Sequence, residues 1–163
     1  MDKKEVAHIL REISVFLELK GENPFKSRAY SNASRIIENV EENISELVES
    51  GELTKIKGIG SGIGEKITEI VKTGKLEYYE DLKKSIPIGH IEMLKIPGVG
   101  PKRIKTLFDK LDIKSVGELE YACKENRLIE LDGFGAKSQE NILEGIPSTF
   151  SNYIYAENIL ETK

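Results

Sequence analysis

Apolar residues recur at helical spacing along almost the whole chain. In two N-terminal segments they stand three and four positions apart, and the second segment begins at the helix-start sequence Asn23-Pro24-Phe25. These apolar positions are Val6, Ile9, Ile13 and Leu17, followed by Tyr30, Ala33, Ile36 and Ile37. Asn43 or Ser45 is expected to cap a third, short helix that ends at Gly51. No run alternates strictly between apolar and polar positions, so the pattern predicts an all-α protein without a sheet.

A Gly-apolar-Gly triplet occurs three times, each time between a short apolar segment and a helical pattern. The three copies are Ile56-Lys57-Gly58-Ile59-Gly60, Ile96-Pro97-Gly98-Val99-Gly100 and Leu131-Asp132-Gly133-Phe134-Gly135. Aliphatic residues follow the second glycine of each copy by seven and by eleven positions, namely Ile67, Leu107 and Ile142, then Val71, Leu111 and Ile146. A common downstream register identifies an internal repeat. Because a helix that ends in such a triplet restarts at once, each copy predicts a helix–hairpin–helix.

The stretch from residue 83 to residue 87 is the best candidate for a domain boundary, because it joins two lysines to Ser85-Ile86-Pro87. Residues 1–84 contain three predicted helices and the first hairpin, and we expect them to form a small helical domain. Residues 85–163 contain the other two hairpins in tandem and a C-terminal linker helix. That last segment, from Ser148 to Leu160, carries apolar residues suited to packing on something that this chain lacks.

Composition narrows the classes of protein that fit. The chain has 163 residues, of which 39% are hydrophobic, enough for a helical core but with no stretch suited to span a bilayer. The N-terminus enters an amphipathic pattern without an apolar signal region, so we expect a cytoplasmic, nucleoid-associated protein. One cysteine, Cys123, excludes an internal disulfide, and with two distant histidines, His8 and His90, it argues against a metal site of nitrogen and sulfur ligands. All three residues are expected to be structural or exposed.

Charge is segregated along the chain, and this changes the reading of its net charge of −4. A negative total argues against a nucleic-acid partner. Between Lys95 and Lys114, however, six basic residues stand against two acidic ones, a local net charge of +4. Acidic residues gather instead between Glu38 and Glu49, and around the third hairpin.

The hairpins carry the candidate chemistry. Glycine allows a close approach of the backbone to a partner, and the helix that follows presents unpaired N–H groups and a positive dipole end to a phosphate. Such contacts position a duplex without reading its sequence. The candidate DNA contacts are Gly58, Gly60, Ser61, Gly62 and Gly64 in the first hairpin, and Gly98, Gly100, Lys102, Arg103 and Lys105 in the second. At the third hairpin, the nearby Glu130, Asp132 and Glu140 favour a structural hairpin that buries Phe134.

Two longer motifs resemble the family X DNA polymerases. Residues 1–84, with Asn23-Pro24-Phe25-Lys26-Ser27-Arg28-Ala29-Tyr30, Gly58-Ile59-Gly60-Ser61-Gly62-Ile63-Gly64-Glu65-Lys66-Ile67 and Thr73-Gly74-Lys75-Leu76, resemble the small N-terminal lyase domain of that family. Residues 85–150 look like the fingers subdomain that follows it. The resemblance is closest to the bacterial and archaeal branch, which is related to DNA polymerase beta.

The resemblance implies a chemical site in the first domain. The lyase lysine of the family falls on Lys66, and its 5′-phosphate pocket falls partly on Lys26, with Tyr30 as the matching tyrosine. Gly62 and Tyr78 stand where polymerase beta carries phosphate-binding lysines, and Arg28 and Lys75 are expected to replace part of that charge. Family hairpins also bind K⁺ or Na⁺ through main-chain oxygens, which correspond to Thr54, Ile56 and Ile59 and to Leu94, Ile96 and Val99.

The resemblance leaves two functions open. The first is the DNA-binding and 5′-deoxyribose-phosphate lyase portion of a base-excision repair polymerase, acting as a monomer on gapped or nicked DNA. Nucleotide transfer would then need a palm domain and its Mg²⁺-binding carboxylates, which this chain does not carry, so the chain is a fragment or part of a split arrangement. The second is a non-catalytic helix–hairpin–helix module that serves another subunit or domain. In that case Lys66 is a surface lysine, Tyr30 a core tyrosine, and Lys26 and Arg28 a solvated helix face.

Overall fold

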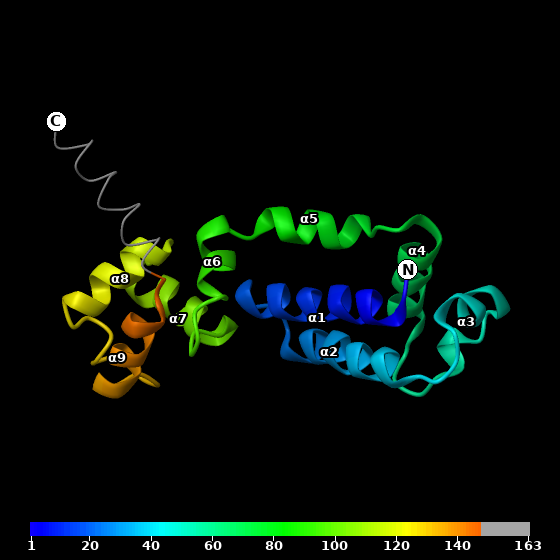
Figure 1. Cartoon of the computed structure of the whole chain (residues 1–163), viewed down its shortest axis with the longest axis horizontal. Helices are drawn as coiled ribbons and strands as arrows, with labels where there is room; N and C mark the ends of the chain where they lie inside the picture. The colour runs from blue at the N-terminus through cyan, green and yellow to red at the C-terminus, as the bar shows by residue number, and fades with distance from the viewer. Residues whose placement is uncertain (148–163) are drawn as a thin grey trace. The chain divides into compact units, whose positions relative to one another are not determined.

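The computed structural model describes residues 1–147 and confirms an all-α protein, since those residues form no strand (Figure 1). The chain divides into two compact units, one of residues 1–86 and a second that begins at Pro87. The expected linker helix from Ser148 to Leu160 lies outside the described residues. Within the described part, no helix is long and apolar enough to cross a membrane.

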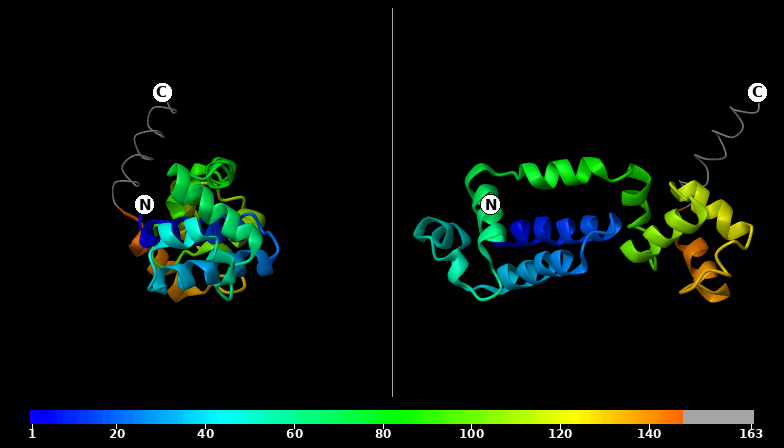
Figure 2. Two further views of the ribbon diagram at one scale, coloured as in Figure 1. Left: turned by 90° about the vertical axis from the view of Figure 1, so that its right-hand side faces the viewer. Right: turned by 180° about the vertical axis from the view of Figure 1, so that it is seen from behind.

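The first unit is built around two long helices, α1 (Lys3–Leu19) and α2 (Pro24–Asn39), which lie side by side (Figures 1 and 2). Asp2 begins α1 in a capping box with Glu5. The second helix begins where the sequence predicts, and the Asn23 side chain accepts from the N–H of Phe25. The buried faces of the pair are mostly apolar, with Phe16 and Tyr30 among aliphatic side chains. Two buried serines tie the helices together: Ser14 Oγ donates to the Ser27 carbonyl at 2.8 Å, and Ser34 Oγ to the Ala7 carbonyl at 2.7 Å.

The remaining helices of the first unit carry the first hairpin. They are α3 (Ile44–Ser50), the 3₁₀ turn η1 (Leu53–Lys55), α4 (Ser61–Thr73) and α5 (Glu77–Ser85). The Asn43 side chain caps α3, and Gly51 ends it with a φ of +71°, as the sequence predicts. On α5, Tyr79 stacks on Phe16 of α1 with ring centroids 6.1 Å apart, which places α5 along α1.

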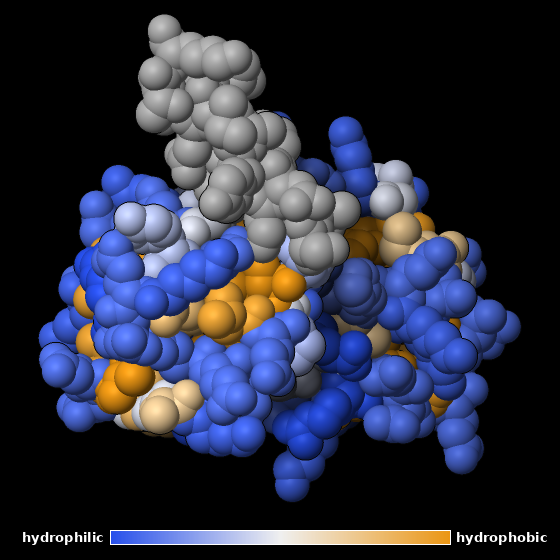
Figure 3. All heavy atoms as spheres, turned by 60° about the vertical axis from the view of Figure 1, so that its left-hand side comes forward, coloured by the Kyte–Doolittle hydropathy of each residue, from blue (hydrophilic) through white to orange (hydrophobic). Residues whose placement is uncertain are grey.

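The second unit holds the two remaining hairpins on four short helices. They are α6 (Ile88–Met93), α7 (Pro101–Leu111), α8 (Val116–Lys124) and α9 (Ala136–Gly145). Its core is made of fully buried side chains, among them Met93, Ile104, Leu107, Ile113 and Leu119. A very close approach of two segments occurs at Gly89, where a Cβ would lie 1.9 Å from the carbonyl oxygen of Lys114. Outside these cores, the face shown in Figure 3 is mostly hydrophilic, with a few apolar patches.

Candidate nucleic-acid interface

The three hairpin turns have one local geometry. In each, the first glycine has a positive φ, of +99° at Gly58 and +85° at both Gly98 and Gly133. Equivalent N–H groups close each turn, from Ile59 to Ile56 and from Val99 to Ile96 at 3.1 Å, and from Phe134 to Leu131 at 3.0 Å. The residues seven positions after the second glycine, Ile67, Leu107 and Ile142, are all buried. The predicted three-fold repeat is therefore confirmed in its backbone as well as its packing. A positive φ explains the first glycine of each pair.

The second glycine has no such explanation within the protein. Gly60, Gly100 and Gly135 are helix N-caps in extended conformations that any residue adopts. A Cβ added to any of the three would meet nothing within 4 Å. The Cβ position is therefore open at all three caps, of which Gly60 is exposed and Gly100 and Gly135 are half-buried, and no side chain satisfies the first N–H groups of α4 or α7. An acceptor from outside the protein can approach these groups closely.

Gly62 and Gly64 differ from each other in the same respect. A Cβ on Gly62 would meet nothing within 4 Å, so Gly62 shares the bare surface of the first hairpin with Ser61. Gly64 is buried, and its Cβ would lie 2.7 Å from Thr54 Cγ2. Its N–H is also used internally, in a bond of 2.8 Å to the Gly60 carbonyl. Close packing of α4 on η1 therefore explains this glycine, without a DNA contact.

The three basic residues of the second hairpin differ in the contacts that their side chains make. Lys102 is exposed and forms no ion pair with any residue of the described chain. Lys105 pairs with Asp109 at 3.0 Å, one helical turn further along α7. Arg103, assigned to DNA from the sequence, instead donates to the carbonyls of Gly98 and Gly133 at 3.0 and 2.9 Å.

The third hairpin receives the Arg103 side chain. The guanidinium lies over the ring of Phe134, 4.9 Å from the centroid. Phe134 is half-buried, so the expectation that this hairpin buries it is met only in part. The basic residue near this turn is Lys137, whose Nζ lies 3.8 Å from Oε2 of Glu140 and whose side chain is largely exposed.

A cluster of two lysines and two tyrosines forms in the first unit, across α2, α4 and α5. The ammonium groups of Lys26 and Lys66 both lie over the ring of Tyr78, at 5.8 and 4.8 Å from its centroid. The same ring stacks on Tyr30, with 6.2 Å between centroids and 15° between planes. The structure thus brings together the three residues that the resemblance assigns to one site. It adds Tyr78, which the sequence marked only as a missing lysine.

Exposure separates the members of this cluster. Lys26 is exposed and Lys66 partly buried, whereas Tyr30 is 4% exposed. Burial, together with the adjacent Tyr78 hydroxyl, raises the pKa of Tyr30 above its ordinary value, so Tyr30 is a neutral phenol at physiological pH. Arg28 lies apart over the ring of Phe25, 4.7 Å from its centroid, and that ring is 75% exposed. Lys75 is exposed, and no described contact joins its side chain to the cluster.

The carbonyls expected to bind a monovalent cation occupy equivalent places in the first two hairpins. The oxygens of Ile56 and Ile96 each accept one hydrogen bond, from Ile59 and Val99 respectively, and a carbonyl has two lone pairs. One acceptor position therefore remains on each for a cation. Among residues 1–147, no three His, Cys, Asp or Glu side chains are grouped to hold a metal ion.

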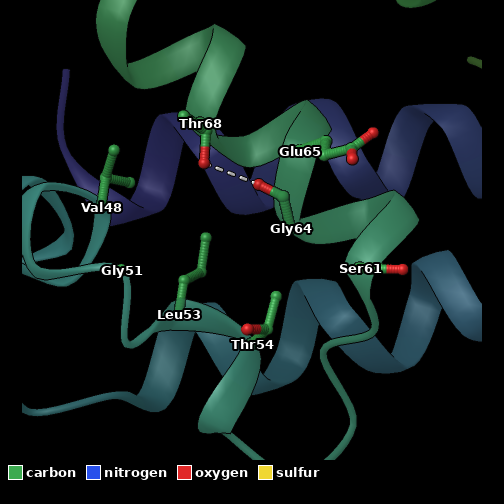
Figure 4. A pocket seen from close by; sticks show the side chains of 8 residues that line it. All are labelled: Val48, Gly51, Leu53, Thr54, Ser61, Gly64, Glu65 and Thr68. Atoms are coloured by element: carbon green, nitrogen blue, oxygen red, sulfur yellow. Dashed lines mark hydrogen bonds between the residues drawn. The ribbon is translucent and has the colours of Figure 1, made fainter.

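A separate hollow of about 320 Å³ lies beside the first hairpin, between α3, η1 and α4 (Figure 4). Its lining is Val48, Gly51, Leu53, Thr54, Ser61, Gly64, Glu65 and Thr68. Neither Lys26 nor Lys66 lines it, and its charged member is Glu65. An acidic side chain in this place does not suit a phosphate, so the hollow is distinct from the lysine cluster.

Comparisons with known proteins agree with this geometry. Residues 1–76 match a family described as a helix–hairpin–helix domain, and residues 91–146 match a SAM-like helix–hairpin–helix tandem. The chain is 36% identical over 146 residues to the DNA polymerase/3′-5′ exonuclease PolX of Bacillus subtilis, covering 90% of this chain and 25% of that protein. It is 31% identical over 84 residues to a DNA ligase of Finegoldia magna, covering 49% of this chain and 12% of the ligase. The chain thus spans about a quarter of the polymerase and a smaller part of the ligase.

Proposed function

Given that this chain is homologous over nine tenths of its length to a family X DNA polymerase, we propose that it binds gapped or nicked duplex DNA through the backbone of its first two hairpins. The observation that carries the proposal is the bare second glycine. Gly60 and Gly100 need no glycine for their backbone conformation or for packing, yet each opens a helix whose N–H groups lack a side-chain cap. A phosphodiester oxygen is the partner that such a helix start accepts.

Charge supports the second hairpin as the stronger contact. Lys102 is exposed in the first turn of α7 and forms no ion pair within residues 1–147, so its ammonium is available to a neighbouring phosphate. The third hairpin offers the same backbone, but Lys137 stands beside Glu140 there. We therefore assign DNA contact to the first and second hairpins and a supporting role to the third.

The test is binding to a fluorescent duplex with a one-nucleotide gap, measured across a range of salt concentrations. Affinity should be the same for unrelated sequences, and its logarithm should fall linearly with the logarithm of the salt concentration. Lys102→Ala should reduce the slope by about 0.9, because one phosphate contact is lost. Lys110→Ala removes the same charge from the opposite end of α7 and serves as the matched control. A strong preference among sequences, or equal effects of the two variants, would contradict the proposal.

The lysine cluster supports a second proposed activity, removal of a 5′-deoxyribose phosphate. Nζ of Lys66 would attack the C1′ aldehyde of the opened sugar and lose water to form an iminium. Loss of the C2′ proton would then break the C3′–O3′ bond, and the leaving phosphate would stay on the downstream strand. Water would finally hydrolyse the imine and release the sugar. Lys26, whose ammonium lies over the same Tyr78 ring as that of Lys66, would hold the 5′ phosphate of that sugar.

Borohydride reduction tests this activity, because it traps the imine as a covalent adduct. We expect an adduct with a 5′-incised abasic substrate in the intact chain. Lys66→Arg keeps the positive charge but cannot form the imine, so it should abolish the adduct and retain gapped-DNA affinity. Lys72→Ala, on the same helix, is the control and should leave the adduct unchanged. If no adduct forms, the chain is a non-catalytic DNA-binding module. If Lys66→Arg still forms the adduct, another amine makes the imine and the assignment of Lys66 is wrong.

We also propose that K⁺ or Na⁺ bridges the hairpin carbonyls to a DNA phosphate. The acceptors would be the main-chain oxygens of Thr54, Ile56 and Ile59 in the first hairpin, and of Leu94, Ile96 and Val99 in the second. Gapped-DNA affinity should then be higher in KCl or NaCl than in tetramethylammonium chloride at the same ionic strength. Equal affinity in the three salts would contradict a bound cation.

A further inference from the structure

We propose that Arg103 is a positioning residue, which fastens the second hairpin to the third and so holds the DNA-binding turn in place. This inference rests on the proposed DNA contact of the second hairpin. The guanidinium donates to the Gly98 carbonyl at 3.0 Å and to the Gly133 carbonyl at 2.9 Å. It also approaches Ser138 Oγ at 3.5 Å and covers the ring of Phe134. One side chain therefore joins the two turns.

The repeat register shows that these contacts relate equivalent positions. Gly98 and Gly133 are the first glycines of their triplets, and each offers its carbonyl to the same guanidinium. Arg103 is the third residue after Gly100, and Ser138, which it approaches, is the third residue after Gly135. The two hairpins thus face each other through matching positions. The matching residue of the first hairpin is Ile63, which has no donor for such a contact.

The chemistry of arginine suits this role. A guanidinium is planar and permanently charged, and its forked N–H groups donate to two acceptors in different directions. Here both acceptors are main-chain carbonyls at turns, and the flat face is stacked on an aromatic ring. Arg103 is half-buried, and these contacts direct its guanidinium to the two turns of the protein. The ammonium of lysine cannot reproduce this set of contacts.

The consequence for binding follows from where the acceptors lie. Gly98 begins the turn whose second glycine, Gly100, opens α7. The hydrogen bond from Arg103 to the Gly98 carbonyl limits the motion of the turn. Because the same guanidinium also binds Gly133, the third hairpin acts as a brace, a second point of attachment for the DNA-binding turn. Backbone N–H groups that are held in place lose less conformational freedom when a phosphate binds. The third hairpin thus supports binding although acidic residues surround it.

The experiment compares Arg103→Ala and Arg103→Lys with Lys102→Ala in the gapped-duplex titration. If Arg103 acts by positioning, both Arg103 variants lower the affinity by about tenfold at every salt concentration, because charged hydrogen bonds are lost, and the slope with salt is unchanged. If Arg103 contacts a phosphate directly, Arg103→Ala reduces the slope by about 0.9 and Arg103→Lys retains most of the affinity. The second pattern overturns the proposal.

Amide hydrogen exchange in the free protein tests the fastening itself, without DNA. The N–H groups of Val99 and Phe134 should exchange faster in both Arg103 variants and not in Lys102→Ala; unchanged exchange overturns the proposal. Failure of the wild-type chain to bind gapped DNA would contradict only the proposed function. The hydrogen-exchange experiment would still test the role of Arg103. Where the Arg103 variants fail to fold, Phe134→Leu replaces them, because it removes the stacking partner and leaves the charge. Faster Val99 exchange in Phe134→Leu supports the brace, and no change overturns it.

Discussion

Replacing Gly100 by Asp should stabilise the second unit and weaken DNA binding at the same time. Gly100 is the N-cap of α7, with φ −97° and ψ 178°, and a Cβ there would meet nothing within 4 Å. The backbone therefore accepts an aspartate without strain. Its carboxylate would cap the free N–H groups of the first turn, which are the same groups that we assign to a phosphate. Protein and DNA thus compete for one set of donors.

The expected magnitudes follow from these two effects. An aspartate N-cap is better than glycine by roughly a few tenths of a kcal/mol, and the lower entropy of the unfolded chain adds about 0.4–1 kcal/mol. The carboxylate also interacts favourably with the helix dipole, by about 0.3–1 kcal/mol at an exposed site. We expect the free energy of unfolding to rise by about 1–2 kcal/mol. Gapped-DNA affinity should fall by at least about tenfold, because the donors are occupied and a negative charge faces the phosphate.

Denaturant unfolding and fluorescence anisotropy measure the two effects on the same samples. Gly100→Ser gives the cap without the charge, so it should raise the free energy of unfolding and lower the gapped-DNA affinity, each by less than Gly100→Asp does. Gly135→Asp is the matched control at the third hairpin, where a Cβ also meets nothing, and it should stabilise without loss of DNA affinity. Gly98→Ala should instead lower the free energy of unfolding, because a φ of +85° costs an L-residue about 1–2 kcal/mol. If Gly100→Asp binds gapped DNA as tightly as the wild type, the assignment of the α7 N-terminus to a phosphate is refuted.

Three further predictions concern Tyr78, His90 and Gly89. Tyr78→Leu removes the ring shared by the two lysines and should erase any preference for a 5′-phosphorylated over a 5′-hydroxyl gap. Tyr78→Phe keeps the ring and loses only a hydroxyl without a described hydrogen-bond partner, so it should keep the preference. Loss of the preference in both variants would contradict a role for the ring. Burial lowers the pKa of His90, so the second unit should lose stability as pH falls below about 6.5, where the unfolded chain gains a proton that the folded one refuses, and His90→Gln should flatten this part of the unfolding profile. Gly89→Ala places a Cβ 1.9 Å from the Lys114 carbonyl oxygen and should destabilise the second unit by at least about 1–3 kcal/mol; unfolding at the wild-type denaturant concentration would show that the two segments separate easily.

Local features of this protein were readable from the sequence because their causes are local. The caps at Asn23 and Asn43 and the left-handed helix end at Gly51 depend on residues within one turn of each other. The three hairpins repeat one short pattern, so a common local structure was predicted for them, and in each the residue seven positions later is buried. Helix positions, fold class and the glycine-based candidate contacts followed from these short-range rules.

Contacts between distant residues were decided by the tertiary structure. Arg103 stands in a basic run that is typical of phosphate binding, and only the packing of the two hairpins turns its guanidinium toward a carbonyl 30 residues away. Tyr78 looked like a missing lysine until packing placed its ring against Lys26 and Lys66. Gly64 repeats the glycine pattern, yet a glycine is required there because the methyl group of Thr54 leaves no room for a Cβ. Residue type and spacing determine what a side chain is able to bind; which partner it meets depends on how helices far apart in the chain pack together.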